Sequence, residues 1–234
     1  MIFGASGGVG NALVRAVASS GLFAQVHAGM RRQTDDLPAG VRPFTFDLMN
    51  ERTVAEFARS LDCPPTLIIV ATGMLHDRAA GIAPEKSVRT LDPAAMARAF
   101  AINSIGPALV AKHMLPRLPK GQRAVFACLS ARVGSIGDNH LGGWHSYRAS
   151  KAALNMLIRN FAIEIARTHP MAIIAALHPG TVDTALSEPF QSNVSPEKLF
   201  TPAQAAHQLL HVIDGLSAAD SGGLFAWDGQ RLPW

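Results

Sequence analysis

"GASGGVG", residues 4–10, lies between the short apolar run "MIF" (residues 1–3) and a stretch with helical periodicity at residues 10–20. A glycine-rich turn between a strand and a helix exposes backbone N–H groups at the helix N-terminus, where these groups and the helix dipole hold an anion. In this spacing Gly4 permits the tight turn, Gly8 lets a pyrophosphate approach the backbone, and Gly10 lets the helix pack closely on the strand. The stretch therefore predicts a dinucleotide-binding turn, although such turns also occur without a ligand. The predicted contacts are Gly4, Ser6, Gly7, Gly8, Val9 and Gly10.

Apolar runs alternate with helix-period segments along the rest of the chain. The runs at 24–30, 42–46, 66–72, 123–130, 172–180 and 223–227 are candidate strands. Strands that are apolar throughout are typical of a parallel sheet covered on both faces, and strand-helix alternation gives right-handed crossovers. We predict an α/β fold of the Rossmann type, a doubly wound, mostly parallel sheet with helices on both faces, in a single domain over residues 1–234.

The first candidate strand is unusually short. Only Met1, Ile2 and Phe3 precede Gly4, whereas a central strand usually has about five or six residues. We expect either a shortened first strand or a natural start further upstream, with the fold maintained by the other strands.

Composition excludes several classes of protein. The net charge of +4 comes from scattered basic residues without interleaved aromatics, so we expect no nucleic-acid partner. Cys63 and Cys128 lack any metal-ligand spacing, which predicts reduced core thiols and no metal site. No apolar stretch approaches the length of a membrane span and the N-terminus has no signal-like segment. We expect a cytoplasmic protein without a membrane partner.

Two arginines follow the second candidate strand, where an acidic residue would bind the ribose hydroxyls of NAD(H). The chain has Arg31 and Arg32 there, and a guanidinium suits a 2′-phosphate. This favours NADP(H) over NAD(H), the alternative being a solvated arginine pair. Asp47 and Leu48, after the third candidate strand, are expected near the adenine edge.

The only tyrosine of the chain, Tyr147, stands four residues before Lys151, one of five lysines. On a helix this spacing places both side chains on one face. A phenol has a pKa of about 10, and a neighbouring ammonium lowers it toward the neutral range. The pair is therefore predicted to transfer a proton in a carbonyl/alcohol reaction.

These motifs, with "ATG" at 71–73, "NSIGP" at 103–107, "YRASK" at 147–151 and "HPGTVDT" at 178–184, occur in one order along the chain. Together they resemble the short-chain dehydrogenase/reductase family over essentially the whole sequence. The stretches "ATGMLHD", "SARVGSIGDN" and "WDGQRLPW" further resemble its branch of C-factor-like and sniffer-like carbonyl reductases.

The resemblance implies a role for each matching residue. Asn103 would hold a water in a proton relay behind Lys151, Tyr147 would donate the proton, and Lys151 would also bind the nicotinamide ribose. Ala71, Thr72 and Gly73 would pass close to the adenosine ribose, with Ala71 in place of the family's usual asparagine. The nicotinamide carboxamide would be seated by Pro179, Gly180, Thr181, Val182 and Thr184.

The catalytic serine departs from the family pattern. The family commonly has two adjacent serines at the end of the fifth strand, whereas this chain has Ser130 followed by Ala131, with Ser135 further on. We take Ser130 as the candidate, with Ser135, or neither, as the alternatives. Loops at about 134–146 and 186–202 are expected to select the substrate, the second as a lid candidate.

The sequence thus predicts an NADP(H)-dependent reductase or dehydrogenase for a small carbonyl or alcohol. The alternative is an NAD(P)-binding signalling or regulatory protein with incidental turnover. A lyase or epimerase is disfavoured because it needs a second acid/base group. The resemblance also implies a homodimer or homotetramer, and neither the substrate nor the reaction direction follows from the sequence.

Overall fold

The computed structural model describes residues 1–34, 36–192 and 194–234, and within them one sheet of eight strands dominates. The strand order is β10-β9-β6-β5-β4-β1-β2-β3. Neighbours are parallel except β9 and β10. The strands are β1 (Ile2–Phe3), β2 (Val26–Met30), β3 (Val41–Thr45), β4 (Leu67–Val70), β5 (Ala124–Leu129), β6 (Ala172–His178), β9 (Leu224–Ala226) and β10 (Arg231–Leu232). The order steps outward from β1 on both sides, so the predicted doubly wound α/β fold is confirmed.

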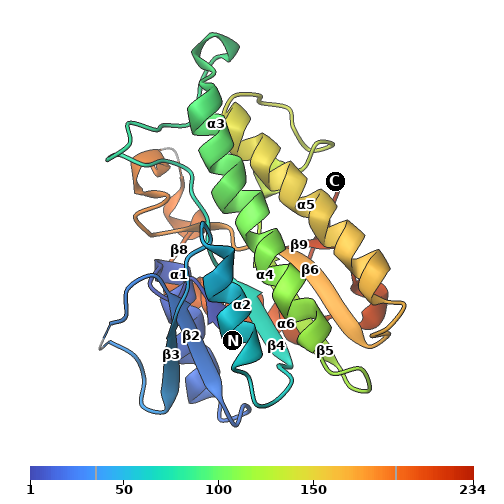
Figure 1. The fold of residues 1–234 in the computed structure, drawn as a ribbon. Helices are drawn as coiled ribbons and strands as arrows, with labels where there is room; N and C mark the ends of the chain where they lie inside the picture. The colour runs from blue at the N-terminus through green and yellow to red at the C-terminus, as the bar shows by residue number, and fades with distance from the viewer. Residues whose placement is uncertain (35, 193) are drawn as a thin grey trace.

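Six α-helices of the described residues cover the two faces of the sheet (Figure 1). They are α1 (Gly8–Ser19), α2 (Glu51–Arg59), α3 (Pro93–Phe100), α4 (Gly106–Met114), α5 (His145–Ile165) and α6 (Pro202–Gly215). One apolar cluster joins α1 and α6 to the sheet, and a second joins α2, α4 and α5 to its other face. Because both faces are covered, β1, β4, β5 and β9 are apolar throughout, as a buried parallel sheet requires. The edge strand β3 differs, since its Arg42 and Thr45 are exposed.

The central strand β1 has only two residues, as the sequence led us to expect. Both are fully buried, and Ile2 and Phe3 pair with β2 on one side and β4 on the other. The Phe3 ring makes edge-to-face contacts with Phe44 and Phe46 at centroid distances of 5.2 and 5.1 Å. These contacts place the turn that follows β1 at the carboxyl edge of the sheet.

One helical run, Pro93–Arg117, is long and apolar enough to cross a membrane by length and composition. The expectation that no stretch reaches that length was therefore wrong, because the run contains few charges over several consecutive helical segments. Of an apolar 18-residue stretch within it, 44% is buried inside the fold, and core helices of soluble proteins have the same length and composition, so this is weak evidence for a membrane span.

The two cysteines are both free thiols, but only Cys128 is buried in the core. Cys63 is exposed, in the turn between α2 and β4, which corrects the expectation of two core thiols. Burial raises the pKa of the Cys128 thiol to about 12, so it is inert at neutral pH.

Candidate active site

Two adjoining cavities lie at the carboxyl ends of the parallel strands, the usual ligand position in this architecture. The catalytic cavity, of about 500 Å³, contains Tyr147 and Lys151. The outer cavity, of about 840 Å³, contains Arg31 and Asp47. Both are lined by Gly7, Ala71, Thr72 and Gly73, so the two form one continuous site.

The glycine-rich turn forms the floor shared by these cavities. At Gly4, Gly8 and Gly10 glycine is required because the backbone conformation or neighbouring atoms leave no room for a side chain. Gly4 has φ +92°, in the left-handed region that favours glycine. A Cβ on Gly10 would lie 2.1 Å from the carbonyl oxygen of Gly4, and one on Gly8 would lie 2.6 Å from Cγ2 of Thr184. α1 begins at Gly8, so its free N–H groups face the site. The cavities are lined by all six residues predicted for this turn, Gly4, Ser6, Gly7, Gly8, Val9 and Gly10.

The two arginines after β2 are placed differently. Both are exposed, but Arg31 lines the outer cavity, whereas Arg32 lines neither of the two cavities described. Asp47 and Leu48 also line the outer cavity. The Asp47 carboxylate accepts a hydrogen bond from the backbone N–H of Met49 at 2.9 Å, so one of its oxygens is committed locally.

Lys151 and Tyr147 lie one turn apart on α5, as the spacing predicted, and the ammonium lies over the tyrosine ring while it donates to the backbone. Lys151 Nζ donates to the carbonyl oxygen of Leu129 at 2.8 Å and lies 5.9 Å from the centroid of the Tyr147 ring. Burial lowers the pKa of Lys151 to about 8 and raises the pKa of Tyr147 to about 12. In this structure the Tyr147 pKa is thus raised and not lowered, because burial removes the phenol from water and disfavours the phenolate.

Asn103 is held in a π-helical segment, Ala101–Ile105, between α3 and α4. Its Oδ1 accepts from the N–H of Met74 at 2.7 Å, and its Nδ2 donates to Met74 O at 2.8 Å and to Ser150 Oγ at 3.0 Å. The amide therefore joins the loop after β4 to α5. A second lone pair of Oδ1 remains for a water.

Ser130 lines the catalytic cavity, whereas Ser135 does not line either of the described cavities. Ser135 is 2% exposed and accepts from the N–H of Asp138 at 3.1 Å. The Ser130 hydroxyl donates to Asn155 Oδ1 at 2.6 Å. Asn155, on α5, is a residue that the sequence analysis missed. Its only signal was the position on the face of the helix that carries Lys151.

The far end of the catalytic cavity contains the residues of the "HPGTVDT" motif. Pro179, Gly180, Thr181, Val182 and Thr184 all line it. Its outer wall is apolar and consists of Leu75, Trp144, Leu186, Phe190 and Val194. Among the residues described, Thr72 Oγ1 and His178 Nδ1 are buried without a hydrogen-bond partner. Both residues line the catalytic cavity, and these orphaned atoms, with the glycine floor, fit a polar ligand such as a dinucleotide.

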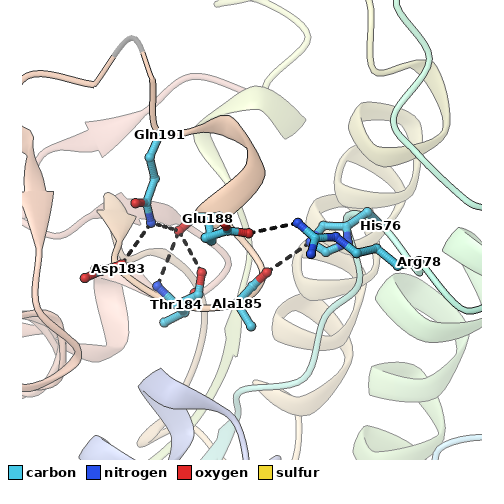
Figure 2. A network of polar contacts seen from close by, with 8 residues as sticks. His76, Arg78, Asp183, Thr184, Ala185, Glu188 and Gln191 are labelled. Carbon is cyan, nitrogen blue, oxygen red and sulfur yellow. Dashed lines mark hydrogen bonds and ion pairs between the residues drawn. The ribbon is translucent and has the colours of Figure 1, made fainter.

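A strap, residues 183–191, follows β7 (Thr181–Val182) and is tied by polar contacts to His76 and Arg78 (Figure 2). Its residues Ala185 and Leu186 line both cavities. His76 Nε2 is 3.0 Å from the carbonyl oxygen of Ala185, and Arg78 Nη2 is 3.0 Å from Glu188 Oε2. Within the strap, Gln191 Nε2 donates a hydrogen bond to Asp183 Oδ1 at 3.1 Å. The predicted loop 186–202 thus begins within this strap. No group of three metal-ligating side chains occurs in the described part of the chain.

Known proteins resemble this chain in sequence and in fold. A family model described as short chain dehydrogenase matches residues 1–195. The C-signal protein of Myxococcus xanthus is 37% identical over 145 residues, covering 62% of this chain and 81% of that protein. The 1-hydroxy-2-glutathionyl-2-methyl-3-butene dehydrogenase of Rhodococcus sp. (strain AD45) is 37% identical over 155 residues, 66% of each chain.

Several solved structures resemble the fold over the whole of this chain. The carbonyl reductase Sniffer of D. melanogaster has a TM-score of 0.86 at 21% identity, with 98% of its own chain covered. An NADPH-bound carbonyl reductase from chicken fatty liver has a TM-score of 0.84 at 23% identity, with 93% covered. At these identities the likeness establishes the fold, which agrees with the sheet order described above.

Proposed function

Because this chain belongs to the short-chain dehydrogenase family, we propose that it is an oxidoreductase that transfers a hydride between NADP(H) and a small carbonyl or alcohol. The observation that carries the proposal is one shared cavity. Tyr147 and Lys151 line it together with Gly7 and Gly8 of the glycine turn, so a dinucleotide on the turn would reach the proton donor.

The cofactor would lie along both cavities. Its pyrophosphate would meet the N-terminus of α1, its adenosine end would occupy the outer cavity, and its nicotinamide end would lie against the Pro179–Thr184 segment. When bound, the nicotinamide supplies or accepts the hydride. Thr72 Oγ1, orphaned and buried where the two cavities meet, is a suitable donor to a ribose or phosphate oxygen.

Tyr147 would donate its proton to the carbonyl oxygen of the substrate. With a pKa of about 12 the phenol is fully protonated at neutral pH, which suits the direction of reduction. Lys151 would hold ribose hydroxyls, and Asn103 would retain the water behind it. Ser130 would contribute its hydroxyl only by leaving Asn155.

The preference for NADP(H) rests on Arg31, whose guanidinium would bind the 2′-phosphate bidentately. A fluorescence titration of the purified chain with NADPH and with NADH tests it. We expect tighter binding of NADPH than of NADH. Arg31→Ala should raise the Kd for NADPH by about tenfold and leave the Kd for NADH unchanged. Arg32→Ala is the matched control, because Arg32 does not line the cavities described. Equal affinities for the two nucleotides would refute the preference.

A second candidate function is nucleotide-dependent signalling with incidental turnover. The observation that favours it is the substrate side of the cavity, where Ala131 lacks a hydroxyl and Ser130 is bound to Asn155. The similarity to the C-signal protein points the same way. Tyr147→Phe separates the two functions, because it removes the proton donor and leaves the cavity walls. Signalling that survives the loss of turnover would favour the second function.

The remaining predictions stay proposals. We propose that loops 134–146 and 186–202 select the substrate, within one domain over residues 1–234. We also propose that the protein is cytoplasmic and forms a homodimer or homotetramer. Sedimentation in an analytical ultracentrifuge would test the oligomeric state.

A further inference from the structure

The helix that carries Tyr147 and Lys151 begins in an unusual way. Trp144, which precedes the first residue of α5, has φ 49° and is the only non-glycine residue with positive φ in the described chain. Gly142 and Gly143 before it also have positive φ, 63° and 64°. A left-handed conformation is unfavourable for a bulky L-residue, so other contacts must hold Trp144 in place.

Those contacts come from Glu85, which is distant in sequence. The backbone carbonyl oxygen of Glu85 accepts a hydrogen bond from the N–H of Trp144. Its carboxylate accepts from the N–H of Ser146 at 3.1 Å and from the Ser146 hydroxyl. Trp144 itself provides no side-chain cap within the described structure. Glu85 therefore caps α5 from another segment of the chain, at the end of the helix where a negative charge is favourable.

Glu85 is buried, with 6% of its surface exposed, yet it remains ionised. Burial alone would raise the pKa of this carboxyl, but the hydrogen bonds from Ser146 outweigh that effect and the pKa is lowered. A buried carboxylate with these contacts is expensive to rearrange. The start of α5 is thus fixed at one conformation.

That conformation determines one wall of the catalytic cavity. The Trp144 ring packs edge-to-face against Phe190, with centroids 5.2 Å apart, and lies 6.3 Å from the Tyr147 ring. Trp144, Tyr147 and Phe190 all line the cavity, whereas Glu85 does not. A change of φ at Trp144 would move the indole and alter the first helical turn, which contains the phenol.

We propose that Glu85 is a positioning residue for the reaction: it holds Trp144 in its left-handed conformation, so that the Trp144–Phe190 wall and the Tyr147 hydroxyl face the same substrate. This inference rests on the proposed function. A planar ring on the carbonyl carbon would stack against the wall, whereas a short alkyl chain would use it little. The contribution of Glu85 should therefore depend on the substrate.

The test compares Glu85→Ala, Glu85→Gln and the control Lys86→Ala, an exposed neighbour. Each protein is titrated with NADPH and assayed with 4-nitrobenzaldehyde and with propanal. For Glu85→Ala we expect an unchanged Kd for NADPH and a loss of kcat/KM of about tenfold for the aromatic aldehyde, with a smaller loss for propanal. Glu85→Gln keeps one acceptor and should fall between Glu85→Ala and the wild type.

Hydrogen exchange of residues 142–150 gives a readout that does not require turnover. We expect Glu85→Ala, or Glu85→Gln if the first variant does not fold, to exchange faster there and nowhere else. An unchanged ratio of aromatic to aliphatic kcat/KM would overturn the inference, and so would unchanged exchange. If the wild type reduces neither aldehyde, the proposed function fails, and the exchange experiment alone decides the role of Glu85.

Discussion

Replacing Lys151 by methionine should stabilise the fold at neutral pH while removing a residue proposed to act in the reaction. Lys151 is 2% exposed, and burial lowers its pKa from 10.5 to about 8. At pH 7 the ammonium is charged in both the folded and unfolded chain, so the folded state bears the full cost of about 3 kcal/mol. Methionine removes that cost but leaves Leu129 O without its donor, a loss of about 1–2 kcal/mol. We expect a net gain of about 1–2 kcal/mol.

The pH dependence gives the sharper test, because it does not depend on the lost hydrogen bond. The unfolded lysine binds more protons than the folded one between pH 8 and 10.5, so wild-type stability rises with pH in that window. The advantage of Lys151→Met should therefore shrink by about 2 kcal/mol between pH 7 and pH 10.

The assay is urea unfolding of both proteins at the two pH values, followed by far-UV circular dichroism. Lys120→Met is the control, because Lys120 is exposed and its replacement should give no such trend. The reasoning is refuted if the stability difference between the wild type and Lys151→Met is the same at pH 7 and pH 10.

Three further predictions follow from the site and from α6. Gly10→Ala should lower the free energy of unfolding in urea by about 2–3 kcal/mol and weaken NADPH binding, because its Cβ would lie 2.1 Å from Gly4 O. Gly7→Ala is the control: its Cβ would lie 3.5 Å from the same oxygen, so its stability should equal that of the wild type. Ala131→Ser adds a hydroxyl inside the catalytic cavity and should raise kcat severalfold. An unchanged kcat would mean that the reaction needs no serine at this position. Arg123→Ala should lower the thermal midpoint, because the Arg123 guanidinium donates to the carbonyl oxygens at the C-terminal end of α6 and its loss should reduce the free energy of unfolding by about 1 kcal/mol. An unchanged midpoint would show that water replaces these hydrogen bonds.

The doubly wound parallel sheet and the glycine turn could be predicted because their signals are local in the sequence. Fully apolar strands and the Gly4–Gly10 spacing do not depend on distant residues. The same is true of the Tyr147–Lys151 pair, since helix geometry alone places residues four apart on one face. The structure has both features where the sequence placed them.

The details that decide the chemistry depend on distant contacts and could not be predicted. Asn155 binds Ser130 across 25 residues of sequence, and Glu85 caps α5 across 61. Neither contact leaves a periodic pattern. The separation of Arg31 from Arg32 could not be predicted either, because both lie in a bend beyond the end of β2, where strand alternation does not apply.

Burial of the active-site groups links the stability of the fold to the direction of the proposed reaction. Burial in the fold favours the neutral forms of Tyr147 and Lys151. It raises the pKa of Tyr147 to about 12 and lowers the pKa of Lys151 to about 8. A protonated phenol is ready to donate to a carbonyl oxygen, whereas oxidation of an alcohol would first require the phenolate. The ammonium of Lys151 is held by Leu129 O, not by the phenol. In the proposed reaction, the resting site therefore favours reduction, for which Tyr147 already holds its proton.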